Sequence, residues 1–152
     1  MALKIGDTAP DFDLPTDGGG RIRLTELRGK PVVVYFYPKD DTSGCTREAQ
    51  DFTALMPEFA ARGVRVVGIS PDNVAAHDKF RTKYDLAVTL ASDVERAVLE
   101  AWGVWVEKSL YGRKYMGVER TTVLVDGEGK VAAVWPKVKV AGHAAAVLKA
   151  LG

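Results

Sequence analysis

Two nearly continuous apolar runs, with a helical pattern between them, constrain the fold of this chain more than any other feature. Residues 32–37 read Val-Val-Val-Tyr-Phe-Tyr, and residues 64–69 form a second such run. A strand without polar alternation is typical of a sheet interior that is covered on both faces. The segment therefore predicts a strand–helix–strand unit with parallel strands and a right-handed crossover.

A helix is predicted directly after Cys45, between these two strands. Its buried face consists of apolar residues at helical spacing, namely Ala49, Phe52, Met56 and Phe59. Pro57 has no backbone N–H and crowds the preceding turn, so we expect it to kink or divide this helix. Gly63 is expected to end it, because glycine commonly follows the last turn.

Two more helices follow the second apolar run. Asp72 or Ser70 can cap the first of them. Its buried face is formed by Ala76, Phe80 and Tyr84. Ser92 and Glu95 have the spacing of a capping box, which predicts the start of a helix that continues through Ala101.

The remaining elements complete a layered α/β fold. Residues 21–24 alternate as a short edge strand, while 121–125 and 131–135 flank a glycine-containing turn and read as a hairpin. A last helix over about residues 141–151 packs through Val147, Leu148 and Leu151. We therefore predict one domain over residues 1–152, with a central mixed sheet flanked by helices in three layers.

The charge balance argues against a nucleic-acid binder. The formal net charge is +1, whereas phosphate binding needs a concentrated basic face. The lysine clusters at residues 108–114 and 137–139 are expected to be solvated surface. No apolar run approaches the ~20 residues of a membrane span, and the first residues lack the regions of a signal peptide. With a single cysteine as well, we expect a cytoplasmic protein that does not bind membranes.

Cys45 is the only cysteine, and it lies where the first apolar strand gives way to the predicted helix. A thiol in the first turn of a helix faces unpaired backbone N–H groups and the positive end of the helix dipole. Both stabilise the thiolate over the thiol. Position alone leaves a small buried hydrophobic residue as an equal alternative. The neighbouring residues favour a reactive thiol.

Pro38 and Thr42 precede Cys45 in the pattern Pro-x-x-x-Thr-x-x-Cys. Proline can wall a thiol pocket without offering a competing N–H, and a threonine hydroxyl can donate to and accept from two bonded oxygens. Glu48 would disfavour a thiolate unless a cation lay between them, so it is expected to orient an arginine. Alternatively, Thr42 is a loop residue that satisfies its own backbone, and Glu48 is an ordinary first-turn glutamate.

Pro38, Thr42 and Cys45 match the active-site signature of the peroxiredoxins. Residues 35–46 resemble the bacterioferritin-comigratory or Q-type subfamily. Further stretches are similar to that subfamily in the same order along the chain, namely residues 6–12, 103–108 and 111–122. The resemblance covers essentially the whole chain and implies a thioredoxin-like fold.

The resemblance implies a thiol-dependent peroxidase without a metal or an organic cofactor. The Cys45 thiolate would attack one oxygen of hydrogen peroxide or an organic hydroperoxide, expel water or an alcohol, and become a sulfenic acid. Arg120 would donate to the sulfur and to the peroxide, and Thr42 would hold the peroxide. Glu48 would hold Arg120 through a charge-assisted hydrogen bond. Taken alone, Arg120 is most simply a surface arginine at the end of a strand.

The chain departs from the subfamily at the second cysteine. Many members carry a resolving cysteine five residues after the first, where this chain has Gln50, and others place it in a following helix. Without a partner for Cys45, the chain resembles a one-cysteine member. An external thiol such as thioredoxin, glutaredoxin or glutathione would then reduce the sulfenic acid. The resemblance also favours a monomer.

Two other functions are open on the sequence. A disulfide reductase or thioredoxin-like carrier normally needs a Cys-x-x-Cys pair, which is missing here. A non-catalytic partner-binding or chaperone-like domain could use the same fold. Such a domain has no use for the combination of Thr42 and Arg120, so we rank it below the peroxidase.

The histidines and tryptophans leave simpler alternatives. His77 and His143 lie in separate predicted helices without the spacing of metal ligands. We assign both to the surface or to packing, which argues against a metal site and a Cys-His protease. Trp102 and Trp105 are expected to be packing residues, with an aromatic lip for bulky organic hydroperoxides as the alternative.

Overall fold

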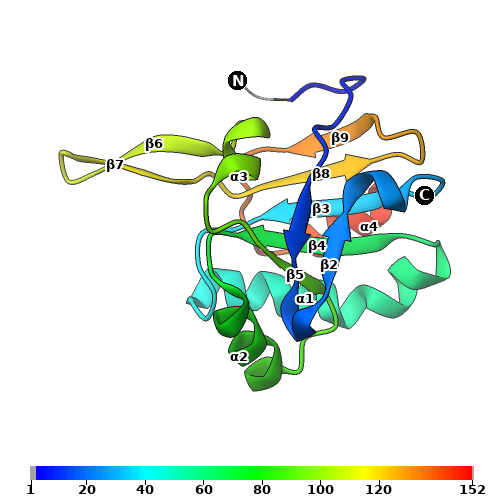
Figure 1. Ribbon diagram of the computed structural model, residues 1–152, viewed down its shortest axis with the longest axis horizontal. Helices are drawn as coiled ribbons and strands as arrows, with labels where there is room; N and C mark the ends of the chain where they lie inside the picture. The colour runs from blue at the N-terminus through cyan, green and yellow to red at the C-terminus, as the bar shows by residue number, and fades with distance from the viewer. Residues whose placement is uncertain (1–2, 152) are drawn as a thin grey trace.

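The computed structural model describes residues 3–151 and centres on a five-stranded mixed sheet (Figure 1). Its strands, in spatial order, are β5 (Thr89–Ser92), β4 (Arg65–Ser70), β3 (Val32–Phe36), β8 (Thr121–Val125) and β9 (Val131–Trp135). β3 pairs with β4 in parallel, as does β4 with β5, whereas β3–β8 and β8–β9 are antiparallel. The two apolar runs thus form neighbouring parallel strands, as predicted, with β3 in the middle.

The two faces of the sheet pack against different layers. Val32, Val34 and Phe36 of β3 join one hydrophobic cluster, while Val33 and Tyr35 join the other. This alternation follows from the two-residue period of a strand, and it explains why β3 is apolar throughout. One face is covered by the helices α1 (Ser43–Ala61), α2 (Val74–Tyr84) and α4 (His143–Ala150).

The opposite face is covered mainly by the amino-terminal part of the chain. It carries the hairpin of β1 (Asp13–Pro15) and β2 (Arg21–Arg23), the short 3-10 helix η2 (Leu24–Leu27), and α3 (Ala97–Ala101). The 3-10 helix η1 (Asp17–Gly19) instead contacts α2 and β5. The α/β class, the mixed sheet and the three layers are confirmed. One outer layer, however, contains only a single short α-helix, and an irregular hairpin takes the place of a second helical layer.

A second hairpin projects from the body of the molecule (Figure 1). It consists of β6 (Trp105–Leu110) and β7 (Arg113–Val118), which pair only with each other. Tyr111 and Gly112 join them with positive φ angles of 51° and 77°, as a two-residue hairpin turn requires. Neither this hairpin nor β5 was predicted, because β6 and β7 are rich in charge and β5 is only four residues long.

The predicted end of α1 is confirmed, but its division is wrong. The helix runs from Ser43 to Ala61 without a break and ends two residues before Gly63. Pro57 lies inside it on the exposed side, where water can hydrate the carbonyl that the proline leaves without a donor.

No helix among residues 3–151 has the length and apolar character that crossing a membrane requires.

Both residues predicted as possible caps of α2 are wrong. The side chain of Asn73, rather than Asp72 or Ser70, accepts the N–H of Ala76 at 2.8 Å and caps α2. The Oδ2 of Asp72 accepts the Ser70 hydroxyl and a backbone N–H from the loop before α1.

The capping-box prediction for α3 is also wrong. Ser92 is the last residue of β5, and α3 begins only at Ala97. Asp93, the residue after Ser92, accepts the N–H of Leu99 at 2.8 Å instead. The predicted end at Ala101 is confirmed.

Candidate active site

Cys45 is the third residue of α1, just beyond the carboxyl end of the central strand β3. Its residue surface is 1% exposed. The first N–H groups of a helix have no intrahelical acceptor and carry the positive end of its dipole, so the sulfur lies beside unpaired backbone donors. The prediction of a thiol in the first helical turn is confirmed.

Arg120 reaches Cys45 because of the register of the sheet. It precedes β8, and the first residue of β8, Thr121, lies opposite Phe36, the last residue of β3. The antiparallel pairing therefore brings Arg120 to the edge from which α1 departs. Its Nη2 donates to the Cys45 Sγ at 3.2 Å, and the side chain is 17% exposed. The alternative of a simple surface arginine is wrong.

Gly44 leaves the space through which Arg120 approaches. A Cβ on Gly44 would lie 3.3 Å from the Arg120 Nη2, so a side chain there would press on the guanidinium that contacts Sγ. Gly44 is a residue of the site that the sequence motif did not identify. Its position directly before the reactive cysteine is the signal that could have identified it.

Glu48 lies on the other side of Arg120. Its Oε1 accepts from the Arg120 Nη1 at 2.6 Å, while its Oε2 has no hydrogen-bond partner among residues 3–151. Burial raises the pKa of Glu48 to about 7, an effect that the charge of Arg120 only partly offsets. The predicted contact between Glu48 and an arginine is present, so one guanidinium contacts both the carboxylate and the sulfur.

Thr42 and Pro38 lie in the loop between β3 and α1. Thr42 is the residue before α1, and its hydroxyl donates to the Lys39 carbonyl at 2.8 Å. Because the hydroxyl proton is used inside the loop, the oxygen of the exposed residue Thr42 keeps only its capacity to accept a hydrogen bond. Pro38 is half-buried and directly follows Tyr37 at the end of the central strand. In the site, Arg120 thus contacts both Cys45 and Glu48 directly. The loop with Pro38 and Thr42 leads into the helix that carries Cys45.

His143 lies behind this site and not on the surface. Its Nε2 lies 2.8 Å from the Thr122 Oγ1, and its ring packs edge-on against Phe52 and Trp135. Burial and, secondarily, the charge of Arg120 lower the pKa of His143 to about 4. It is therefore a neutral, hydrogen-bonded packing residue at neutral pH.

The two tryptophans differ in their surroundings. Trp102 is 2% exposed and packs against Phe12 and Phe36 in the cluster on the far face of the sheet, so its assignment to packing is confirmed. Trp105 is half-buried at the base of the projecting hairpin, and the Arg96 guanidinium lies 5.2 Å from its ring centroid. Neither observation places an aromatic lip over Cys45.

One group of side chains within residues 3–151 has the composition of a metal site. Atoms of Asp40, Asp72 and His77 lie within 4.8 Å of one another. Both ring nitrogens of His77 already contact protein oxygens, however, so neither has a lone pair free for a cation. The group is a hydrogen-bonded network and not a metal centre.

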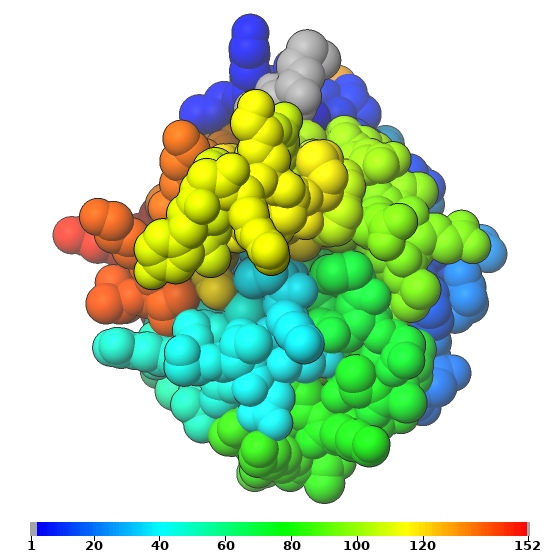
Figure 2. Space-filling view, turned by 90° about the vertical axis from the view of Figure 1, so that its left-hand side faces the viewer, coloured from blue at the N-terminus to red at the C-terminus, as the bar shows by residue number. Residues whose placement is uncertain are grey.

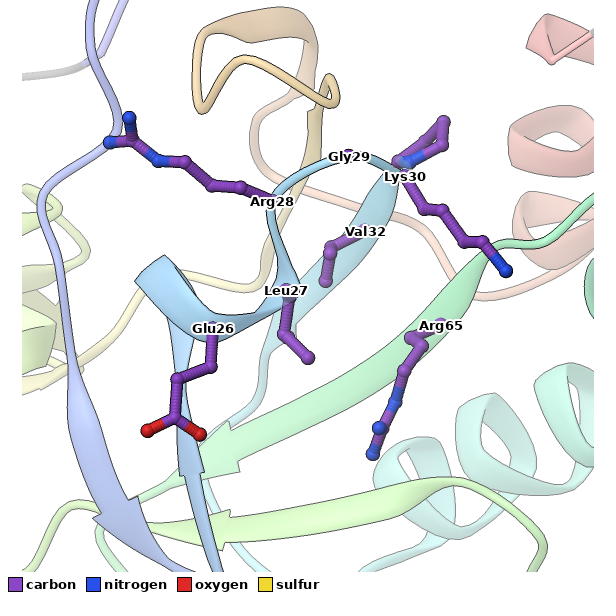
Figure 3. Close-up of a pocket in the computed structure, with 8 residues that line it drawn as sticks. Glu26, Leu27, Arg28, Gly29, Lys30, Val32 and Arg65 are labelled. Atoms are coloured by element: carbon purple, nitrogen blue, oxygen red, sulfur yellow. The ribbon is translucent and has the colours of Figure 1, made fainter.

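The pocket in Figure 3 lies at the opposite end of β3 from Cys45. It measures about 290 Å³ and is lined by residues around the start of β3 together with Arg65. Its cationic side chains diverge, since Arg28 extends away from Lys30 and Arg65. Among residues 3–151, no cysteine, serine or histidine lines it, and its charged side chains do not converge on one point.

The chain matches known proteins over nearly its whole length. The model of the AhpC/TSA family matches residues 5–134. A protein of Coxiella burnetii named putative peroxiredoxin bcp is 52% identical over 148 residues, which are 97% of this chain and 98% of the relative. Peroxiredoxin Bcp of Bacillus subtilis is 44% identical over 99% of this chain and 96% of its own.

Solved structures agree with the sequence relatives. A structure of the bacterioferritin comigratory protein of Xanthomonas campestris, described for the alkyl peroxide reduction activity of that protein, has a TM-score of 0.90 and 45% identity, covering 98% of this chain and 95% of its own. A mutant of PrxQ from Xylella fastidiosa has a TM-score of 0.94 and 34% identity, with 99% and 96% covered. With a cysteine, an arginine and a glutamate in contact at the end of β3, this chain belongs to the AhpC/TSA family, among the peroxiredoxins named Bcp or PrxQ.

Proposed function

We propose that this peroxiredoxin reduces hydrogen peroxide and organic hydroperoxides through the sulfur of Cys45. The thiolate attacks one peroxide oxygen and forms an S–O bond while the O–O bond breaks. The other oxygen leaves with the bonding electron pair and takes up a proton to become water or an alcohol, and Cys45 becomes a sulfenic acid. The observation that carries this proposal is the 3.2 Å contact between the Arg120 guanidinium and Sγ.

Arg120 is assigned the role of stabilising the charge that develops on the leaving oxygen. Its Nη1 is held by Glu48, so the guanidinium is oriented before the peroxide arrives. The Thr42 oxygen, whose proton is given to Lys39, can accept the O–H of a hydroperoxide. The N–H of Cys45 in the first turn of α1 adds a further donor. Pro38 would bound the loop side of this space without a competing N–H.

The oxidised enzyme needs a second thiol from outside the chain. Cys45 is the only cysteine, so its sulfenic acid cannot form a disulfide within the protein. We assign its reduction to an external thiol such as thioredoxin, glutaredoxin or glutathione. The first thiol condenses with the sulfenic acid to a mixed disulfide and releases water, and a second thiol then regenerates Cys45. A monomer in the reducing cytoplasm fits this cycle. The net charge of +1 favours no nucleic-acid partner.

The test follows the first oxidation directly. Reduced protein is mixed with one equivalent of hydrogen peroxide or cumene hydroperoxide in a stopped-flow instrument, with Cys45→Ser as the control. Tryptophan fluorescence reports the rate, and mass spectrometry identifies the product. We expect oxidation far faster than that of free cysteine and a sulfenic acid that glutathione or thioredoxin reverses. A rate equal to that of free cysteine would contradict the proposal and favour a partner-binding domain.

A further inference from the structure

The helix α2 holds the loop before Cys45 through two consecutive aspartates. Asp41 is exposed, has a φ of 60°, and accepts from Lys83 and Tyr84 at the end of α2. Asp40 points inward and contacts His77 on the buried face of the same helix. In Figure 2 the cyan segment that contains this loop lies between the yellow hairpin and the green part of the chain that contains α2. Neither contact takes part in the proposed reaction.

The contact of Asp40 with His77 is fully enclosed. The His77 Nδ1 lies 2.6 Å from the Asp40 Oδ2, and the two side chains are 0% and 5% exposed. The other ring nitrogen, Nε2, lies 3.0 Å from the carbonyl oxygen of Ala91, which can only accept. Nε2 must therefore carry a proton, and the short contact at Nδ1 requires a second proton shared between the imidazole and the carboxylate. Without that second proton, a lone pair would face a negative charge.

Asp40 connects this histidine to the segments at the carboxyl ends of β3 and β4. Its Oδ1 accepts from the Tyr37 hydroxyl at 2.6 Å, and its backbone N–H donates to the Asp72 carboxylate at 2.9 Å. Asp72 also accepts the hydroxyl of Ser70, the last residue of β4, at 2.7 Å. Both Asp40 oxygens and its N–H are thus engaged by elements that flank the loop. A network in which every member is satisfied fixes one conformation.

The fixed loop determines where Thr42 lies. Thr42 follows Asp40 by two residues and is tied to the carbonyl of Lys39, the residue before Asp40. A rotation of the Asp40 backbone would therefore move both ends of that hydrogen bond and the start of α1. We propose that Asp40 and His77 are positioning residues for the peroxide reaction: their buried contact fixes the Thr42 oxygen in its place at the start of α1, and peroxide reduction slows when the contact is lost.

The same geometry makes the contact dependent on pH. The groups that face His77 are Asp40 from the loop, Asp72 from the segment after β4, the ring of Tyr37 directly after β3 and the Ala91 carbonyl from β5. Burial lowers the pKa of His77, but Asp40 and the Ala91 carbonyl outweigh burial and raise it above the ordinary 6.5. A raised folded pKa means that the contact is present below 6.5 and is lost as pH rises through the folded value.

The inference rests on the proposed peroxidase activity, and the test compares two reagents on one sulfur. Hydrogen peroxide needs Thr42 and the loop, whereas iodoacetamide needs only an accessible thiolate. The proteins are wild type, His77→Gln and the control Lys83→Ala, which removes the exposed contact from the same helix to Asp41. Circular dichroism verifies that each is folded. Second-order rate constants with both reagents are then measured at neutral pH.

We expect His77→Gln to react with peroxide about 10- to 100-fold more slowly than wild type, a loss typical of a misplaced catalytic group. Its reaction with iodoacetamide should not slow, because a loosened loop can only expose the buried Sγ further. Lys83→Ala should resemble wild type with both reagents, because exposed ion pairs contribute little. A folded His77→Gln that reduces peroxide as fast as wild type overturns the inference. A wild-type protein as slow as free cysteine contradicts the proposed function instead.

A measurement on wild type alone decides the matter if His77→Gln does not fold. Between about pH 7 and pH 10, NMR of the imidazole follows the proton on His77 while both rate constants are recorded. We expect the ratio of the peroxide rate constant to the iodoacetamide rate constant to fall as His77 loses its proton. A ratio that stays constant through the titration of His77 overturns the inference.

Discussion

Two pairs of a cation and a carboxylate lie on either side of the loop before α1, and their hydrogen-bonding groups are satisfied to different degrees. Arg120 and Glu48 approach to 2.6 Å beside the reacting sulfur, and His77 and Asp40 approach to the same distance behind the loop. Glu48 leaves one oxygen without a partner among the described residues, whereas both oxygens of Asp40 accept a hydrogen bond. The pair at the sulfur is therefore incomplete, since one carboxylate oxygen lacks a partner among the described residues. The pair behind the loop is closed, since both carboxylate oxygens accept a hydrogen bond.

This difference separates two tasks. Arg120 is partly exposed and contacts Sγ, so its charge is available to a group that arrives from solvent. His77 is fully enclosed, and its charge acts on nothing except the protein. A charge aimed at a substrate stabilises a reaction, while a charge enclosed by its partners stabilises a conformation. Variants of the two pairs should therefore fail in different assays.

The largest effect is expected from Asp40→Ala. It leaves the buried His77 without its carboxylate, and breaking a buried pair from one side costs about 3–5 kcal/mol of unfolding free energy. Urea denaturation followed by circular dichroism measures the loss. The neighbouring Asp41→Ala, which removes only exposed contacts, is the matched control and should lose much less. Equal losses in the two variants would remove the distinction between a closed and an exposed contact.

Arg120→Ala should fail in the opposite way. The second-order rate constant with peroxide should fall by about 10²- to 10³-fold, as on removal of a preorganised donor at a reacting centre. The fold should persist, because the raised pKa of Glu48 allows this carboxyl to take up a proton when its partner is removed. Stopped-flow oxidation together with urea denaturation tests both halves. Wild-type reactivity would contradict the role assigned to Arg120.

Glu48→Gln tests whether burial, which raises the pKa of Glu48, outweighs Arg120, which lowers it. The folded pKa of Glu48 is about 7 against an ordinary 4.5, so the folded state binds more protons between these values. The contribution of Glu48 to stability is then present below about 4.5 and is lost as pH rises through about 7. Relative to Glu48→Gln, wild type should lose about 2 kcal/mol of unfolding free energy between pH 5 and pH 8. A relative gain would show that Arg120 outweighs burial.

Thr42→Val should have the smallest effect and act on rate. The substitution removes the oxygen that is proposed to accept the hydroperoxide proton, and we expect peroxide reduction to slow by about tenfold, or about 1.4 kcal/mol. Stability should change by less than about 1 kcal/mol, because the Thr42 side chain does not cap α1. Thermal denaturation beside stopped-flow kinetics separates the two. A collapse of the fold with an unchanged rate would support the purely structural alternative for Thr42.

The sequence predicted the pair of Arg120 and Glu48 at the sulfur and missed the enclosed pair of His77 and Asp40. Cys45, Arg120 and Glu48 were identified by a local motif and a resemblance, and the central strands by their uninterrupted apolar character. Asp40 and His77 are 37 residues apart and carry no spacing that marks a pair. Their contact exists because parallel β3 and β4 bring the loop and α2 to one edge of the sheet. Such a contact depends on packing between elements, which periodicity does not report.

The same reasoning applies to other missed elements. The charged hairpin of β6 and β7 forms from the geometry of its turn and not from an apolar face. The start of α3 was misplaced because Ser92 serves as the end of a strand. Neither the turn geometry of the hairpin nor the pairing of Ser92 in a strand is visible in the apolar pattern of the sequence.

The projecting hairpin also has a consequence for local opening of the chain. A two-stranded ribbon is marginal on its own, so the amide hydrogens of β6 and β7 should exchange with solvent long before those of β8. Arg120 lies between β7 and β8, at the boundary of these two regimes. The N–H of Val138 holds the Arg120 carbonyl at 2.8 Å. Local opening of the β6–β7 hairpin can therefore stop at this hydrogen bond, so that the Arg120 guanidinium keeps its place while the hairpin opens and closes.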